Sequence, residues 1–121
     1  MDTIKVPTGI KAPSRQTLKK YGLDLTDWLI LVEDSNLVCP ICKRRFGEIY
    51  GNSKRPLMPV IDHVHIRNFK RMKPEKRRMF VRGLPCNYCN RRRLGRGMDL
   101  KIARNIVTYL ERYENKKPPS D

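Results

Sequence analysis

Apolar residues recur at helical spacing most clearly in the last part of the chain, Met98–Glu114. One apolar stripe there contains Leu100, Ala103, Val107 and Leu110, and a neighbouring stripe contains Ile102, Ile106, Tyr109 and Tyr113. Asp99 lies directly before the first stripe, where it can act as an N-cap. The pattern predicts a long helix with a broad apolar face. Such a face is usually part of a core, and a dimer surface is the alternative.

Two shorter helices are expected nearer the N-terminus. At 27–33 the apolar side chains are nearly continuous, which fits either a mostly buried helix or a buried strand. Asp24 and Thr26 are candidate N-caps just ahead of this run, so they favour the helix. A second helix is expected at 15–21, after the cap residue Ser14 and before a glycine.

A pair of strands is predicted in the middle of the chain. The first, 57–61, leads directly into an Asp-His pair, and the second covers 80–84. Between them, 66–80 is strongly basic with a proline in its centre, and part of it is expected to be helical. A short helix is predicted at 87–94 and ends before a glycine.

The charge of the chain indicates its class of partner. Among 121 residues, Lys and Arg number 27 and Asp and Glu 12, which gives a formal net charge of +15. Nucleic acid is the leading candidate, because Lys and Arg that neutralise phosphates release counterions. An anionic membrane surface is the alternative. However, no run approaches the ~20 apolar residues of a membrane span, and no long basic amphipathic helix is evident.

A chain of this length is expected to form one domain with a moderate core. We expect a flexible N-terminal arm at 1–13, a single domain at 14–115 and a flexible tail at 116–121. The first residues contain no apolar segment of the secretory type. A reducing, cytoplasmic location is therefore expected.

Four cysteines form two Cys-x-x-Cys pairs, Cys39 with Cys42 and Cys86 with Cys89. In a reducing compartment this arrangement predicts a tetrahedral four-cysteine zinc site. The alternative is four unrelated thiols, with or without redox chemistry. A redox pair needs only one such motif in a thioredoxin-like setting, which the sequence lacks.

Both histidines of the chain lie in one hexapeptide, VIDHVH at 60–65. Three interpretations compete. His63 and His65 could bind a second metal ion together with Asp62, because side chains two apart on a strand point to one face. They could instead be catalytic groups, or polar residues without a chemical task.

Phosphodiester hydrolysis provides a catalytic role for this segment. The reaction needs an activated water, a metal ion that carries developing charge, and a positively charged bed for the strand. Asp62 is a suitable ligand for Mg²⁺, and His63 is a suitable general base near neutral pH. Asn90 directly follows the last cysteine and could supply a second oxygen ligand. Zinc at the cysteines would fix where the helix begins and so position Asn90 against Asp62.

A basic segment that follows Asp62 and His63 could form the positively charged surface that binds the DNA strand. Twelve Lys or Arg residues and a single acid, Glu75, lie from Arg67 to Arg96. The candidate nucleic-acid contacts are Arg67, Lys70, Arg71, Arg77, Arg78, Arg82, Arg91, Arg92 and Arg93. A charge run alone is usually a solvated face, but next to a candidate metal-and-base pair we expect contacts with a nucleic-acid backbone.

These segments together resemble the recombination endonuclease VII family of phage nucleases, within the larger HNH or ββα-metal (His-Me finger) group. The similarity runs in order over about residues 17–113. It comprises Lys20–Leu23, Cys39–Cys42, Asp62–His65, Val81–Asn90, Leu94-Gly95 and a last helix with Tyr109-Leu110. The Asp-His-x-His segment and the Arg-Gly-Leu-x-Cys-x-x-Cys-Asn segment are specific in combination.

The resemblance implies an α+β fold, with a small zinc-stapled ββα-metal nuclease core surrounded by helices. It implies a metal-dependent DNA endonuclease that is structure-selective for branched DNA such as Holliday junctions, or a nicking enzyme of relaxed specificity. Asp62 and Asn90 would bind catalytic Mg²⁺ or Mn²⁺, and the four cysteines would hold structural zinc. His63 would be the general base, and His65 would contact the scissile phosphate or support the metal site. Family members can form intertwined dimers, so a homodimer is one expected arrangement, and a phage-encoded protein would act in the host cytoplasm.

Two rival hypotheses stand beside this one. A non-catalytic zinc-containing DNA-binding module explains the cysteines and the charge, but it does not explain the grouping of Asp62, His63 and Asn90. An HNH nicking enzyme of restriction or DNA packaging shares the chemistry and differs in its substrate.

Overall fold

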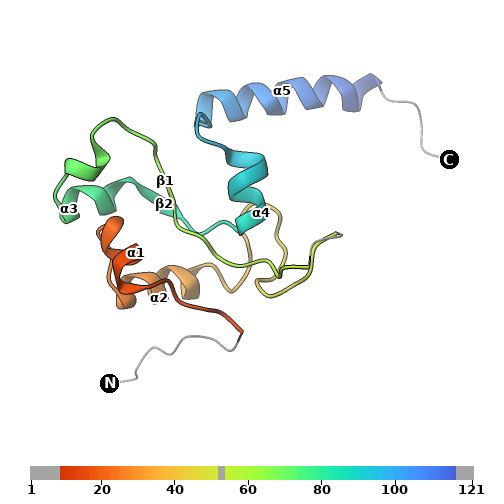
Figure 1. Ribbon diagram of the computed structural model, residues 1–121. Coiled ribbons are helices and arrows are strands. Elements are labelled where there is room, and N and C mark those ends of the chain that lie inside the picture. Colours follow the sequence, from red (N-terminus) through yellow and green to blue (C-terminus); the bar gives the residue numbers. More distant parts are fainter. Residues whose placement is uncertain (1–8, 52–53, 117–121) are drawn as a thin grey trace.

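The computed structural model describes residues 9–51 and 54–116 (Figure 1). Its helices are α1 (Arg15–Lys20), α2 (Leu25–Asp34), α3 (Pro74–Arg77), α4 (Asn87–Cys89) and α5 (Leu100–Lys116). The strands β1 (Asp62–His63) and β2 (Val81–Gly83) form a sheet, with 3-10 turns at Phe69–Arg71 and Arg78–Phe80 and a π-helical segment at Asn90–Leu94. The predicted α+β fold class is confirmed. The outer parts of the expected arm and tail, 1–8 and 117–121, lie outside the described residues.

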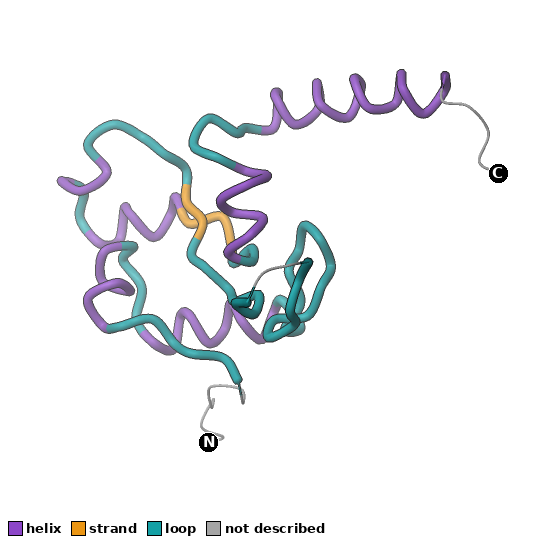
Figure 2. The backbone as a smooth tube through the Cα atoms, turned by 45° about the vertical axis from the view of Figure 1, so that its right-hand side comes forward, coloured by secondary structure: helices purple, strands orange, loops and turns teal. Residues whose placement is uncertain are grey.

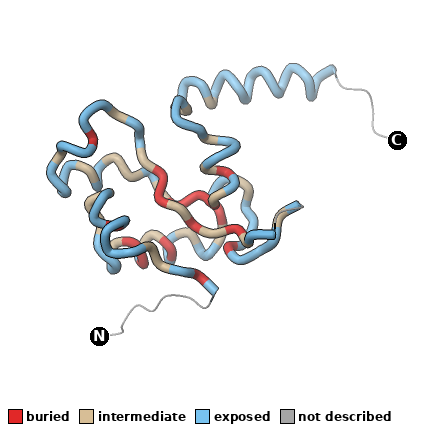
Figure 3. Tube along the Cα trace, in the orientation of Figure 1, coloured by how far each residue is buried: buried red, intermediate tan, exposed pale blue. Residues whose placement is uncertain are grey.

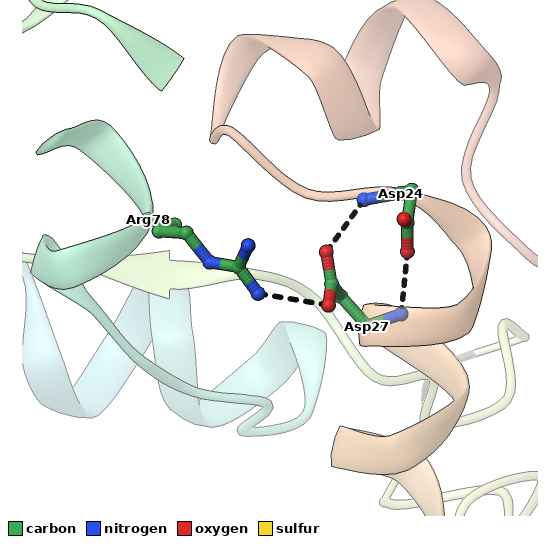
Figure 4. Close-up of polar contacts among 3 residues, drawn as sticks. All are labelled: Asp24, Asp27 and Arg78. Atoms are coloured by element: carbon green, nitrogen blue, oxygen red, sulfur yellow. Dashed lines mark hydrogen bonds and ion pairs between the residues drawn. The ribbon is translucent and has the colours of Figure 1, made fainter. Parts of the chain in front are cut away.

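The first two helices begin at predicted cap residues. Ser14 caps α1 through its side chain. Asp24 and Asp27 form a reciprocal capping box at the start of α2, in which each carboxylate accepts a hydrogen bond from the other residue's backbone N–H (Figure 4). Arg78 donates to the same Asp27 carboxylate at 2.8 Å. The predicted helix is therefore confirmed, and the strand alternative for this run is wrong.

Helix α2 supplies the centre of the core. Trp28 and Val32 are almost completely buried, and each such side chain contributes about 1.5–3 kcal/mol relative to an exposed one. The other buried members of this core are Ile10, Leu18, Leu29, Cys39, Phe46, Leu57, Ile61, Leu84, Cys86 and Cys89. Most of the buried stretches in Figure 3 lie in the middle of the molecule, and this core contains three of the four cysteines.

The two strands are the regular part of a longer antiparallel ribbon, at the centre of Figure 2. Beyond the strands, the Val60 N–H donates to the Pro85 carbonyl at 2.9 Å, and Pro59 forms an isolated bridge with Cys86. The strand predicted at 57–61 is wrong in its extent, because this segment is extended chain held by isolated bonds. Pro85, opposite Val60, has no N–H to donate back to the Val60 carbonyl, so the ladder is interrupted there.

Helix α5 has the predicted position, and the Asp99 carboxylate accepts from the Ile102 N–H at 2.8 Å. The expectation that its apolar face belongs to the core is wrong. The exposed large apolar side chains of α5 are Leu100, Ile102, Ile106, Val107, Tyr109, Leu110 and Tyr113. The helix extends away from the body of the molecule after the turn that follows Leu94 (Figures 1 and 3), so the described part of the chain leaves this face open.

Candidate active site and zinc centre

The four cysteines come together although the two pairs lie far apart in the chain. Their sulfur atoms all lie within 4.8 Å of one another, and the Cys42 and Cys86 sulfurs are 4.0 Å apart. A tetrahedral zinc ion with Zn–S bonds of ~2.3 Å places its sulfurs ~3.8 Å from one another. The cluster therefore has the dimensions of a four-cysteine zinc site.

Hydrogen bonds around the Cys39 sulfur favour the thiolate form that zinc requires. The backbone N–H groups of Ile41 and Cys86 donate to the Cys39 sulfur at 3.4 and 3.3 Å. Burial alone would raise the pKa of Cys39, but the N–H groups around its sulfur outweigh burial and lower that pKa to about 7. Burial raises the pKa of Cys86 to about 12, so this thiol needs a cation nearby to ionise. The donor set thus fits zinc.

The cysteine cluster is joined directly to the candidate catalytic strand. Cys86 caps α4 by accepting from the Cys89 N–H, and the Pro59 bridge to Cys86 lies three residues before Asp62. The Met58 N–H also donates to the Asn87 side-chain oxygen at 3.0 Å. The start of α4 and the approach to β1 are therefore held in one fixed arrangement.

A β-bulge brings the Arg82 guanidinium to Asp62. Asp62 pairs with Gly83 and His63 with Val81, which leaves Arg82 as the extra residue of β2. The Arg82 Nε and Nη2 donate to the two carboxylate oxygens of Asp62 at 2.8 and 3.0 Å. Asp62 is only 7% exposed, and this two-pronged, charge-assisted contact offsets the cost of burying its charge.

His63 has surroundings of a different kind, because adjacent residues of a strand point to opposite faces. Its ring centroid lies 4.8 Å from that of Phe69, 5.0 Å from Tyr21 and 4.5 Å from His65. Burial lowers the pKa of His63 below its ordinary 6.5, and the positive charge of His65 lowers it further. Near neutral pH, His63 is therefore a neutral imidazole that can accept a proton.

Asn90 directly follows the last cysteine, at the end of α4. It opens the π-helical segment, in which the Gly95 N–H donates to the Asn90 carbonyl at 3.3 Å. Leu94 lines a shallow hollow of about 210 Å³ together with Asp62 and Arg82. The segment that Asn90 opens thus ends at this hollow, and Asn90 itself does not line it.

The comparison with known families agrees with this geometry. A family model described as recombination endonuclease VII matches residues 14–112, which include both cysteine pairs and Asp62–His65. The chain belongs to the recombination endonuclease VII family. This membership indicates a nuclease that acts on DNA. No curated protein and no solved structure matches the chain significantly.

For a member of the recombination endonuclease VII family, the predicted DNA contacts divide into two groups. Five have exposed side chains that make no hydrogen bond or ion pair with the described residues: Arg67, Lys70, Arg71, Arg91 and Arg92. Three others are held by the protein itself, since Arg78 binds Asp27, Arg82 binds Asp62, and Arg93 donates to the Cys89 sulfur at 2.9 Å. Arg77 is half-buried. No helix in the described ranges is long and apolar enough to cross a membrane.

Several contacts of the site were missed by the sequence analysis. The Arg93–Cys89 contact could have been predicted from the sequence, because the two residues are four apart in the predicted helix at 87–94. The Arg82–Asp62 contact depends on the bulge, and the rings of Tyr21 and Phe69 reach His63 from other segments, so these had no local signal.

Proposed function

We propose that this endonuclease VII family member is a metal-dependent DNA endonuclease of the HNH, or ββα-metal, type. One observation carries the proposal: two adjacent side chains of β1 have opposite surroundings. Asp62 is a buried carboxylate that lines the 210 Å³ hollow together with Leu94. His63 is a neutral imidazole packed among aromatic rings. The first suits a metal ligand and the second suits a general base. The order β1, β2, α4 fits a ββα unit.

Asp62 and Asn90 would hold the catalytic Mg²⁺ or Mn²⁺. A carboxylate has about four lone-pair positions, and the Arg82 contact occupies two, so Asp62 can bind a cation while Arg82 orients it. When bound, such an ion neutralises charge on the phosphate and on the departing oxygen.

His63 takes a proton from the water that attacks phosphorus, and the packed rings of Tyr21 and Phe69 fix the position of its imidazole. The new bond from the water oxygen to phosphorus forms as the bond to the 3′ oxygen breaks in line. The departing 3′ oxygen takes a proton from solvent water, so the products carry a 5′ phosphate and a 3′ hydroxyl. His65 is exposed beside His63, where it contacts the scissile phosphate or supports the metal site.

The four cysteines hold a structural zinc, which fixes the start of α4 and hence Asn90. The exposed arginines and lysine stand on both sides of the catalytic pair in the sequence. Arg67, Lys70 and Arg71 follow His65, and Arg91 and Arg92 follow Asn90. We propose that the phosphates of the DNA backbone contact these two groups of basic residues.

We also propose that α5 pairs with α5 of a second copy of the chain. An isolated helix of this length is marginal in water, and its apolar face needs a partner. A dimer carries two active sites, which fits paired cuts in a branched substrate.

Cleavage assays test the proposed function. Supercoiled plasmid, a synthetic four-way junction and a matched linear duplex are incubated with Mg²⁺ or Mn²⁺. We expect cleavage that needs the added ion, with the junction cut faster than the duplex. Binding without cleavage of any substrate would show a non-catalytic DNA-binding module. Equal cleavage rates on the junction and the duplex would contradict structure selectivity and would support a nicking endonuclease of relaxed specificity.

A further inference from the structure

A second hollow lies on the other face of the α4 region. It has a volume of about 450 Å³ and is lined by Tyr50, Arg55, Leu57, Asn87, Tyr88, Arg91 and Arg92. This volume is within the ~300–1,000 Å³ range of small-molecule sites. Asn87 with Arg91, and Tyr88 with Arg92, are four apart along this region, whereas Leu94 lines the hollow that contains Asp62. The hollow is thus separate from the proposed catalytic pair.

Two tyrosine rings form one wall of this hollow and are supported from outside it. The rings of Tyr50 and Tyr88 meet edge to face, with centroids 4.9 Å apart. Arg44 lies 4.2 Å from the Tyr50 ring centroid and Arg93 lies 5.0 Å from that of Tyr88, and neither arginine lines the hollow. Arg93 is itself anchored on the Cys89 sulfur. The aromatic wall is therefore fixed to the zinc cluster before any ligand arrives.

The remaining lining is basic. Arg55, Arg91 and Arg92 contribute three guanidinium groups, and the described residues contribute no acidic side chain to the hollow. Guanidinium groups bind phosphate through paired hydrogen bonds, and tyrosine rings accept the flat face of a nucleobase. A site that offers both groups together suits a nucleotide more closely than it suits a free anion or an apolar ligand.

We propose that this hollow binds one unpaired nucleotide of the DNA substrate, with its base against Tyr50 and Tyr88 and its phosphate at Arg55, Arg91 and Arg92. A base inside an intact duplex is stacked on both faces and cannot reach the tyrosines. The site would therefore favour DNA that contains an extruded or unpaired nucleotide. The inference rests on the proposed function in one respect, that DNA is the substrate, and it does not depend on catalysis.

Binding without added Mg²⁺ or Mn²⁺ tests the proposal. Anisotropy of a labelled duplex with one bulged nucleotide is compared with that of the fully paired duplex, using the zinc-loaded protein. We expect Tyr88→Leu to weaken binding of the bulged duplex by about 5- to 150-fold, the range of base–aromatic stacking, and to change the paired duplex by less than about 2-fold. Tyr88→Phe keeps the ring and should retain the preference. Arg67→Ala is the control, because loss of this distant charge should weaken both duplexes equally.

A second measurement needs no variant. With 2-aminopurine as the bulged base, stacking on tyrosine should quench its fluorescence when the wild-type protein binds. Unchanged fluorescence, or equal weakening of both duplexes by Tyr88→Leu, would overturn the proposal. Competition by inorganic phosphate as strong as by a deoxynucleoside monophosphate would also overturn it, because the base would then contribute nothing. Absence of cleavage with the bulge preference intact would count against the nuclease and not against this site.

Discussion

At the scale of single residues, Arg82 decides how Asp62 is held. Its guanidinium gives two hydrogen bonds to the buried carboxylate and a third, at 3.1 Å, to the Met98 carbonyl just before α5. We expect Arg82→Ala to lower the free energy of unfolding by about 1–3 kcal/mol, because Asp62 loses charged hydrogen bonds and stays buried. Urea denaturation in zinc-containing buffer measures this change.

Two comparisons make this prediction specific. Arg67→Ala removes an exposed arginine and should change the free energy of unfolding by less than about 0.5 kcal/mol. In an Asp62→Asn background, Arg82→Ala should cost less than in the wild type, because the two residues are coupled. The same cost in both backgrounds would contradict the pairing.

The sequence predicts the chemical character of the site better than its internal contacts. Asp62, His63 and the four cysteines could be singled out because their side chains suit metal binding and proton transfer at a recognisable spacing. The partner of Asp62 could not, because Arg82 looks like one more member of a basic run. Its role depends on one extra residue in β2, which turns the guanidinium inward, and no local pattern marks that bulge.

At the scale of elements, Gly22 allows α1 and α3 to pack closely. It has a φ of +71°, and a Cβ atom there would overlap the Pro74 carbonyl oxygen at the start of α3. We expect Gly22→Ala to lower the free energy of unfolding by more than about 2 kcal/mol, as backbone strain and a steric clash add. Gly51→Ala is the matched control, because Gly51 has a φ of +62° and nothing within 4 Å of a Cβ atom. Equal losses in thermal or urea denaturation would show that the close approach has no effect.

Helix α5 gives a second prediction at this scale. Light scattering should give a mass of twice the 14.3 kDa chain for the wild type, and Val107→Glu should produce a monomer by placing a charge on the apolar face. Thr108→Glu puts the same charge on the polar face and should leave the dimer intact. A wild-type monomer at all concentrations tested would contradict the proposed pairing.

The elements show where local pattern is sufficient and where it is not. Cap residues and periodicity predict α1, α2 and α5, because these signals act within one turn of the helix. The same periodicity cannot tell whether an apolar face meets the core, another chain or water, so the exposure of α5 was not predictable. The strand predicted at 57–61 does not form in full because the propensity of one segment takes no account of its partner, in which Pro85 lacks the N–H that would bond to Val60.

At the scale of the whole molecule, the cysteine cluster is the main cross-link between distant segments. Three of its four cysteines are completely buried in the same core as Trp28. Elemental analysis should find one structural zinc per chain. Its removal by a strong chelator, or by Cys86→Ser, should abolish cooperative unfolding followed by circular dichroism, because metal binding contributes folding energy. A zinc-free chain with unchanged helix content and a cooperative transition would contradict this role.

The proposed function depends above all on His63 acting as the general base of a DNA-cleaving site. The most direct measurement is the single-turnover rate of plasmid nicking with Mg²⁺ for the wild type, His63→Ala and His65→Ala, at matched DNA affinity and zinc content. We expect His63→Ala to slow nicking by about 10²–10⁴-fold and His65→Ala to have the smaller effect. Full activity of His63→Ala, with His65→Ala inactive, would contradict the assignment.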